Sequence, residues 1–244
     1  MGKIYYIMGK SSSGKDTLFQ KIKQELPMLQ TVTLYTTRPK REGEREGVEY
    51  HFVTDEQMHI FERQGKVVEL RTYNTVHGAW KYATIEDGQV NLAESDYLMI
   101  GTLESYGKLK KYYGAAYLVP VYIEVEDGER LNRALTRERQ QEVPRYAEMC
   151  RRFLADTEDF SEEHLRAAGI KKRYYNDDQK RCLDEIIEDI RYGKFEGCSR
   201  TQRCNSIFAE CSCRESGITG VHCEWRARNR KEDAGKVICH GTFM

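Results

Sequence analysis

The N-terminal part of the chain contains Gly9-Lys10-Ser11-Ser12-Ser13-Gly14-Lys15-Asp16-Thr17, directly after the apolar run Ile4–Met8 and before a helix-like segment. This order predicts a strand, a glycine loop and the start of a helix. Gly9 and Gly14 let the loop turn its backbone N–H groups inward, while Lys15 and the helix N-terminus add positive charge. The stretch therefore predicts a binding loop for a polyphosphate, with a solvated Gly/Ser turn as the alternative.

The composition favours one globular domain with an appendage. The chain has 244 residues, of which 39% are hydrophobic, which is enough to bury one good core. Lys and Arg together number 39, as do Asp and Glu, so the formal net charge is zero. A non-specific surface for nucleic acid or for an anionic membrane is therefore not expected, and any affinity for phosphate must be local.

The sequence also gives an expectation about the compartment. No apolar run is long enough to span a bilayer, and the N-terminus lacks the charged, apolar and small-residue sections of a signal peptide. Six of the eight cysteines lie after residue 195, and only Cys150 and Cys182 lie in the body. Such usage is typical of a reduced, intracellular domain, so we expect a cytoplasmic protein.

Strand-like and helix-like segments alternate over residues 1–195. Strands are predicted at 4–8, 31–35, 47–53, 66–74, 77–84, 97–100, 119–125 and 170–175. Helices are predicted up to Pro27, from the capping box at Thr54 to Gly65, and at 104–113, 129–160 and 183–190. The alternation predicts an α/β fold, in which a parallel sheet has helices on both faces and carries a small β-rich insert.

Two segments with arginines are candidate anion-binding elements. Arg38 and Arg41 stand three residues apart in the loop 36–44, where they either grip one anionic group or lie solvated. The helical stretch 129–160 is dense in arginine and is broken near Pro144. This break predicts two helices whose connecting loop closes as a lid. Most of the arginines are expected to be solvated, with two or three aimed at a cleft.

Several motifs follow one another in a recognisable order. After the glycine loop come Thr36-Thr37-Arg38-Pro39 with Arg41 and Gly43-Glu44, then Gly47-Val48-Glu49-Tyr50-His51-Phe52-Val53, and finally Tyr175-Asn176-Asp177-Asp178. Over almost all of residues 1–195 the chain resembles the guanylate kinases, which are P-loop nucleoside monophosphate kinases. The resemblance implies a P-loop NTPase fold over 1–195, with a monophosphate-binding insert spanning 34–84 and a helical lid spanning 133–152.

The resemblance also implies roles for individual residues. The implied ATP-binding residues are Gly9, Lys10, Ser11, Ser12, Ser13, Gly14, Lys15, Asp16, Thr17 and Asn176. The implied acceptor-binding residues are Arg38, Arg41 and Tyr50 for the phosphate, Glu69 for the N–H edge of guanine, and Tyr82 and Thr84. The implied catalytic residues are Lys15, Arg137, Arg139 and Arg152.

The chain departs from the family pattern in the acceptor region. Leu34 stands where the family usually has a serine that touches the acceptor phosphate. The segment 98–102 lacks the aspartates that family members place after this strand. Tyr82 arrives later than its family counterpart, which leaves His77-Gly78 as a rival alignment. These departures leave the choice of base open.

A further departure concerns the metal. Asp16 follows Lys15 where a Ser or Thr hydroxyl usually meets Mg²⁺, and Thr17 comes one place later. A carboxylate beside a triphosphate is repulsive unless a cation lies between them. We hypothesise that Asp16 and Thr17 together hold hydrated Mg²⁺.

The resemblance implies an enzyme of purine nucleotide metabolism that transfers the γ-phosphoryl group of ATP to a nucleoside monophosphate, with GMP as the expected acceptor. The alternatives are a kinase for another phosphorylated nucleoside or sugar phosphate, and a non-catalytic binding module. Gly9, Gly14 and Lys15 are all present, which favours an enzyme. We expect ATP, Mg²⁺ and GMP as ligands, no nucleic-acid or membrane partner, and a monomer or homodimer.

Residues 196–244 do not fit the family. They are polar and show no sustained helix or strand period, so a disordered tail is expected. One alternative is a zinc site formed by Cys211, Cys213, Cys223, Cys239 and His240, although no Cys-x-x-Cys pair occurs. The other is translation from a shifted or extended reading frame.

Overall fold

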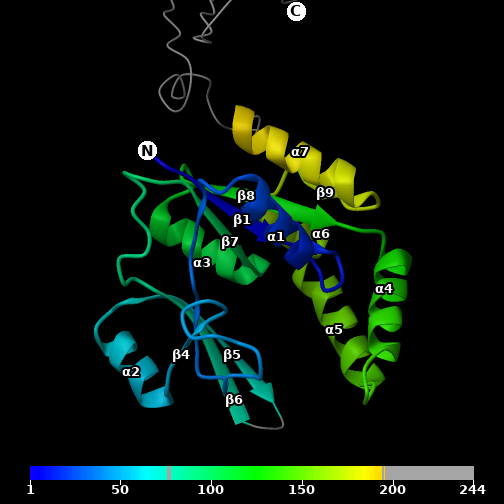
Figure 1. Ribbon diagram of the computed structural model, residues 1–244, viewed down its shortest axis with the longest axis horizontal. Helices are drawn as coiled ribbons and strands as arrows, with labels where there is room; N and C mark the ends of the chain where they lie inside the picture. Colours follow the sequence, from blue (N-terminus) through cyan, green and yellow to red (C-terminus); the bar gives the residue numbers. More distant parts are fainter. Residues whose placement is uncertain (76–77, 194, 196–244) are drawn as a thin grey trace, which may run out of the picture. The chain divides into compact units, whose positions relative to one another are not determined.

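The computed structural model describes residues 1–75, 78–193 and 195 (Figure 1). Contacts divide the chain into two units, Met1–Glu196 and Gly197–Met244. The predicted tail at 196–244, with its alternative zinc site, lies outside the described residues, as does His77 of the rival alignment.

Five parallel strands form the main sheet, in the order β2-β7-β1-β8-β9. Their bounds are Gln30–Thr31 for β2, Tyr97–Gly101 for β7, Ile4–Met8 for β1, Leu118–Glu124 for β8 and Arg173–Tyr175 for β9. The central strand β1 has later strands on both sides, so the strand order reverses at its carboxyl end. Open parallel sheets bind ligands at such a point, and here the glycine loop follows it.

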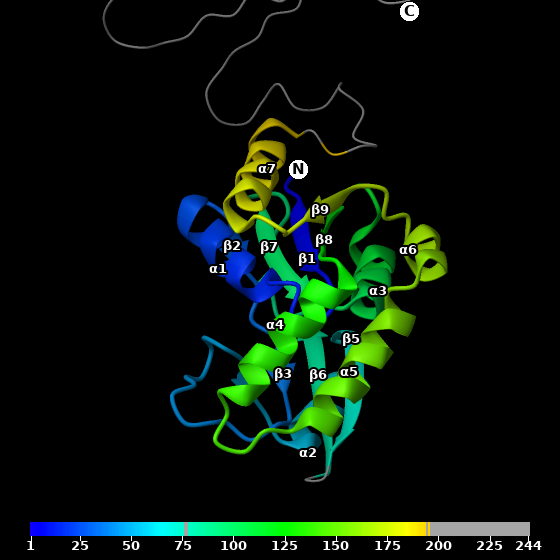
Figure 2. The same cartoon turned by 90° about the vertical axis from the view of Figure 1, so that its right-hand side faces the viewer.

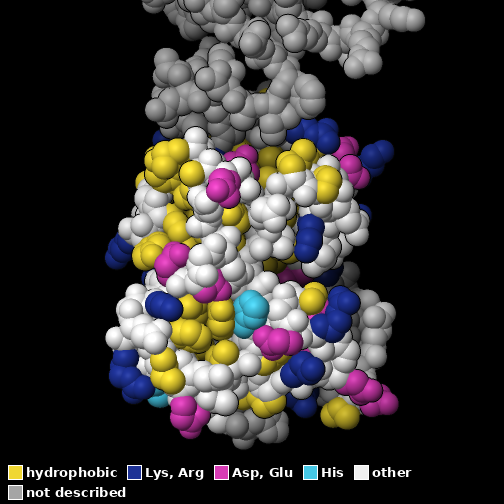
Figure 3. All heavy atoms as spheres, turned by 60° about the vertical axis from the view of Figure 1, so that its left-hand side comes forward, with side chains coloured by type: hydrophobic (Ala, Val, Ile, Leu, Met, Phe, Trp, Pro, Cys, Tyr) yellow, Lys and Arg dark blue, Asp and Glu magenta, His cyan; other side chains and the backbone are white. Residues whose placement is uncertain are grey.

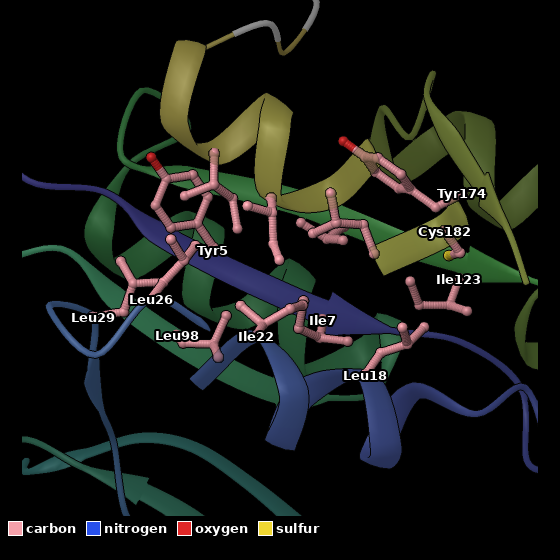
Figure 4. Close-up of a cluster of buried hydrophobic side chains, with 14 residues drawn as sticks. Tyr5, Ile7, Leu18, Ile22, Leu26, Leu29, Leu98, Ile123, Tyr174 and Cys182 are labelled. Carbon is pink, nitrogen blue, oxygen red and sulfur yellow. The ribbon is translucent and has the colours of Figure 1, made fainter. Parts of the chain in front are cut away.

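Helices cover both faces of this sheet (Figures 1 and 2). They are α1 (Lys15–Glu25) and α7 (Gln179–Tyr192) on one face, and α3 (Leu103–Tyr113) and α6 (Glu162–Ala168) on the other. Alternate residues of β1 serve the two faces, because strand side chains point to opposite sides. Tyr5 and Ile7 pack with α1 and α7 (Figure 4), while Ile4, Tyr6 and Met8 pack with α3 and α6. The predicted parallel sheet with helices on both faces is confirmed.

A second sheet lies in the segment between β2 and β7, with the order β4-β3-β6-β5. Its bounds are Tyr35–Thr36 for β3, His51–Phe52 for β4, Val67–Thr75 for β5 and Gly78–Ile85 for β6. The helix α2 (Asp55–Arg63) begins with the predicted capping box, in which Thr54 and Gln57 bond reciprocally. A small core of Met58, Ala83 and Ile85 joins α2 to the sheet.

The arginine-rich stretch forms two helices, α4 (Asp127–Arg139) and α5 (Tyr146–Asp159), and Pro144 lies in the turn between them. No residue of α5 is buried. Figures 1 and 2 show this helical hairpin and the β5–β6 hairpin extending from the same end of the main sheet. The break predicted near Pro144 is confirmed.

Two predictions about strands were wrong, and one helix was missed. The single strand expected at 31–35 is two strands, because Thr31 pairs with β7 while Tyr35 pairs with β4 and β6 in the other sheet. The strand expected at 47–53 shrinks to His51–Phe52. The helix α6 was not predicted, although Ser161 caps its start and Gly169 lies at its end.

The surface of the described part carries both charges. On the face shown in Figure 3, Lys and Arg side chains alternate with Asp and Glu and leave no broad area of one sign. No helix within the described residues is long and apolar enough to cross a membrane.

Candidate active site

The glycine loop between β1 and α1 depends on two glycines. A Cβ on Gly9 would lie 2.6 Å from the carbonyl oxygen of Ile123, and one on Gly14 would lie 2.4 Å from Nδ2 of Asn176. Gly14 also has a φ of 83°, in the left-handed region that favours glycine, and it forms the N-cap of α1. The sequence thus permits a tight loop that ends at a helix N-terminus, where backbone N–H groups lack intrahelical partners.

Two serine hydroxyls of this loop and the side chain of nearby Asn176 have polar atoms without a hydrogen-bond partner among the described residues. Asn176, which follows β9, donates from Nδ2 to the carbonyl oxygen of Ser13 at 2.7 Å and so fastens the loop to the neighbouring strand. Within the described residues, the Oγ atoms of Ser12 and Ser13 and Oδ1 of Asn176 are buried without a hydrogen-bond partner. Buried polar atoms normally find partners, so these three mark a place for a polar ligand.

A cleft of about 510 Å³ opens beside the loop. It is lined by Ser12, Gly14, Asp16, Thr17, Arg133, Arg137, Asn176, Asp177 and Gln179. Loop, lid helix and α7 therefore meet around one space, and four of the predicted ATP-binding residues face it together with Asn176. Lys15 lies next to it, and its Nζ is 3.4 Å from Oδ2 of Asp16.

The residues that could hold Mg²⁺ are few. Asp16 and Thr17 both line the cleft, and the Asp16 side chain is 82% exposed. No group of three or more His, Cys, Asp or Glu side chains suited to a metal occurs in the described part of the chain. One carboxylate and one hydroxyl fit Mg²⁺ that arrives with a nucleotide, since Mg²⁺ keeps several waters and takes its other ligands from phosphates.

The Arg38 guanidinium lies over two aromatic rings. Arg38 is only 4% exposed and lies over the rings of Tyr50 and Phe52, at 5.5 and 5.7 Å from the ring centroids. Its Nη2 donates to Glu44 at 2.7 Å, and this hydrogen bond raises the pKa of the guanidinium. The second oxygen of Glu44 accepts from the backbone N–H of Arg41 at 2.8 Å. One carboxylate thus binds the Arg38 guanidinium and the Arg41 backbone in the predicted phosphate site.

The remaining predicted acceptor residues lie on the β5–β6 hairpin. The Tyr82 ring is 5.7 Å from that of Tyr50, so both tyrosines adjoin Arg38. Burial, followed by the neighbouring Tyr82, raises the pKa of Tyr50, which keeps its phenol a neutral donor. Glu69 and Thr84 are buried and bonded to each other at 3.2 Å. Each of the two is therefore already partnered within the hairpin.

The predicted catalytic arginines are not all in one place. Arg137 lines the cleft, whereas Arg139 does not belong to the lining. Arg152 lies on α5, where its Nε donates to Glu148 at 2.9 Å. Hydrogen bonds from Arg151 and Arg152 lower the pKa of Glu148 to about 2. Of the three lid arginines, the structure brings Arg137 alone to the glycine loop.

Sequence reasoning missed two residues at the loop. Arg133 lines the cleft and donates from Nη2 to the carbonyl oxygen of Asn176 at 3.0 Å. Its spacing of four residues from Arg137 on one helix was the available signal. Asp156 on α5 accepts from the backbone N–H of Ser11 at 2.7 Å. Nothing in the local sequence indicates this second contact, which ties the lid to the loop.

A glycine loop after the central strand of a parallel sheet, with an arginine-bearing lid and a separate insert, defines a P-loop NTPase fold. The sequence model described as "Guanylate kinase" matches residues 1–162. This chain belongs to the guanylate kinase family.

Individual relatives agree with this assignment. The guanylate kinase of Tropheryma whipplei (strain Twist) is 31% identical over 104 residues, which is 43% of this chain and 52% of that protein. The guanylate kinase of Neisseria gonorrhoeae is 35% identical over 106 residues, 43% of this chain and 50% of that protein. The chain thus spans about half the length of the curated relatives it matches. The crystal structure of guanylate kinase from Anaplasma phagocytophilum shares the fold, with a TM-score of 0.56, 19% identity, and coverage of 81% of this chain and 88% of that one.

Proposed function

We propose that this protein transfers the γ-phosphoryl group of ATP to the phosphate of a nucleoside monophosphate, with GMP as the acceptor and GDP and ADP as products. The observation that carries the proposal is the set of unpartnered atoms at the glycine loop, on Ser12, Ser13 and Asn176, beside a cleft that Arg133 and Arg137 enter. Hydroxyl donors next to guanidinium groups suit the phosphates of a nucleotide, and the acceptor Oδ1 of Asn176 suits one of its N–H or O–H groups. The family assignment supports the choice of GMP.

Phosphoryl transfer to a phosphate requires positively charged groups rather than a general base. An acceptor phosphate has a second pKa of about 6, so it is already an anion at pH 7 and needs no proton removed. The reaction instead requires that charge repulsion be cancelled and that the two nucleotides be aligned. We assign charge stabilisation to Lys15 and Arg137, with Arg139 and Arg152 reaching the site only if the lid moves.

The acceptor is assigned to the insert. Arg38, Arg41 and Tyr50 would hold its phosphate in place of the Glu44 carboxylate, which now binds the Arg38 guanidinium and the backbone N–H of Arg41. This exchange of one anion for another keeps the Arg38 guanidinium paired throughout, so no buried cation is left alone. The phenol of Tyr50 adds a neutral donor.

Asp16 and Thr17 would hold Mg²⁺, which supplies positive charge on the β- and γ-phosphates when ATP is bound. The reaction is assigned to the cytoplasm, where its nucleotides are found, and to a monomer or homodimer. Lys15 remains the residue whose charge the proposal needs most.

A coupled assay of ADP formation tests the proposal. The full chain is incubated with ATP, Mg²⁺ and one monophosphate at a time: GMP, AMP, CMP, UMP or a sugar phosphate. ADP formation that depends on GMP is the expected result. Turnover only with another acceptor would replace GMP in the proposal, and no turnover with any acceptor would favour a binding module.

A further inference from the structure

The inner face of the β5–β6 hairpin continues from the phosphate site. Strand register places Glu69 opposite Thr84 and Arg71 opposite Tyr82. Because alternate residues of a strand share a face, Glu69, Arg71 and Tyr73 point the same way. The Tyr82 ring lies 5.7 Å from Tyr50 and 5.6 Å from Tyr73. A row of rings therefore leads from the groups assigned to the phosphate towards Arg71.

Arg71 covers Glu69. Its Nε donates to Oε2 of Glu69 at 3.1 Å and its Nη2 donates to Oε1 at 3.2 Å. Oε1 also accepts from Thr84 at 3.2 Å. The Glu69 side chain is 1% exposed and that of Arg71 is 10% exposed. The carboxylate is thus enclosed by its partners, and Arg71 is the outer member of the pair.

Gly101, the last residue of β7, has no room for a side chain. A Cβ on Gly101 would lie 2.0 Å from the hydroxyl oxygen of Tyr6, which bonds to Ser105. The ionisable groups that act on Arg71 are the Glu69 carboxylate and the phenols of Tyr6 and Tyr73. The Arg71 cation is therefore balanced by one buried anion, the Glu69 carboxylate.

The free edge of Arg71 offers donors only. A guanidinium has five N–H donors and no acceptor, and two of the five are used on Glu69. The donors left over match a ligand edge that carries two acceptors side by side. A 6-oxopurine has such an edge in O6 and N7, to which arginine binds with two hydrogen bonds.

We propose that Arg71 reads the base of the acceptor nucleotide through O6 and N7, and that Glu69 is a positioning residue that holds Arg71. The inference rests on the proposed function and names its substrate class as 6-oxopurine nucleoside monophosphates, GMP and IMP alike. The 2-amino group of guanine meets no free carboxylate. AMP is rejected because its 6-amino group is a hydrogen-bond donor and would face the N–H donors of Arg71, with which it cannot bond.

Initial rates with saturating ATP and Mg²⁺ and with GMP, IMP or AMP test the inference on the full chain. We expect kcat/KM values for GMP and IMP within about tenfold of each other and a value for AMP at least about a hundredfold lower. A site built to bond the 2-amino group would reject IMP by several orders of magnitude. An IMP value a hundredfold or more below that for GMP would therefore overturn the inference.

Substitution of Arg71 gives a second test. Arg71→Met should lower the GMP-to-AMP ratio of kcat/KM by roughly 10- to 100-fold, because it removes two charge-assisted hydrogen bonds to one substrate only. Arg71→Lys keeps the positive charge but lacks the paired N–H donors of a guanidinium, so it should lower the GMP-to-AMP ratio of kcat/KM less than Arg71→Met does. The exposed Arg63 of the same insert gives the control Arg63→Met, which should leave the ratio unchanged.

The ratio separates base reading from a structural role, because misfolding lowers both rates together. Melting temperature and ATP binding are measured for each variant, and Arg71→Lys serves if Arg71→Met fails to fold. If GMP and AMP rates fall equally in Arg71→Lys, the inference is overturned while the proposed function stands. A wild-type protein without turnover on any monophosphate would overturn the proposed function and the inference with it.

Discussion

Asn176 joins the end of the last strand of the main sheet to the glycine loop. Its Nδ2 donates to the carbonyl oxygen of Ser13, and Gly14 permits this approach because a Cβ there would lie 2.4 Å from the same nitrogen. Asn176 is 2% exposed, so neither partner of the hydrogen bond can turn to water instead. The shape of the loop therefore depends on a residue far from it in the sequence.

Asn176→Leu should destabilise the fold and weaken ATP binding. The substitution keeps the size of the side chain but leaves the Ser13 carbonyl unpaired, at a cost of about 1–3 kcal/mol. Urea unfolding measures the change in the free energy of unfolding, and calorimetry measures ATP affinity. Asn132→Leu, at an exposed position of α4, is the matched control and should stay within about 0.5 kcal/mol. Equal effects of the two substitutions would contradict the role given to Asn176.

At the scale of elements, the lid helix α4 presents two arginines to the cleft. Arg133 and Arg137 are four residues apart and both line it, since this spacing puts them on one helix face. Arg139, two residues further on, points elsewhere around the helix. The spacing of four residues singles out Arg133 and Arg137 in the sequence, and the hydrogen bond from Arg133 to the carbonyl oxygen of Asn176 fastens this helix face beside the glycine loop.

Arg137→Met should lower kcat by roughly a hundredfold, because it removes a cation from the transferring phosphate. Arg139→Met, on the same helix, should leave kcat nearly unchanged. Steady-state rates with ATP and GMP measure both. A larger loss in Arg139→Met than in Arg137→Met would show that the lid turns by part of a helical turn when it closes.

The sequence predicts elements best where the pattern is local. The strand of residues 4–8, the glycine loop and the capping box of Thr54 are all visible in short windows, and the structure has each of them. The segment 31–35 reads as one strand because Val32 and Leu34 alternate with polar residues, yet its two ends pair with different sheets. The choice between the sheets is made by partner strands elsewhere in the sequence, β7 for Thr31 and both β4 and β6 for Tyr35, which no local pattern encodes.

In the candidate site, too, local features are predictable from the sequence and contacts between distant segments are not. Loop residues that share a motif are predictable as a group, because one backbone shape serves them all. Contacts between separate elements are not predictable in this way, and the hydrogen bond from the Ser11 backbone N–H to Asp156 is one of them. The cover of Arg71 over Glu69 is a contact within β5 between residues that share a face, and the prediction that Glu69 meets the base did not take it into account.

At the scale of the whole molecule, Phe195, the last described residue, packs against the core of the main sheet. The Phe195 ring lies 5.6 Å from that of Tyr5, and it packs against the core beneath α7. The core formed by α1, α7 and the main sheet therefore includes Phe195 as its last apolar member in the described part of the chain.

A chain shortened to residues 1–195 should keep its activity and melting temperature. A further Phe195→Ala substitution in that shorter chain should lower stability, by up to about 3 kcal/mol, because its ring is only partly buried. Thermal unfolding and the GMP-dependent assay measure both. A large loss of either property on shortening alone would assign residues 196–244 a structural role.

The central claim is that cations from separate segments hold two nucleotides end to end. It is tested most directly by calorimetry with adenosine and guanosine joined through their 5′ oxygens by a chain of five phosphates. We expect one molecule to bind per chain, roughly a hundredfold or more tighter than ATP alone, since one ligand then occupies both sites. Lys15→Met and Arg38→Met should each weaken it. Binding no tighter than that of ATP, or an affinity unaffected by Arg38→Met, would contradict the claim.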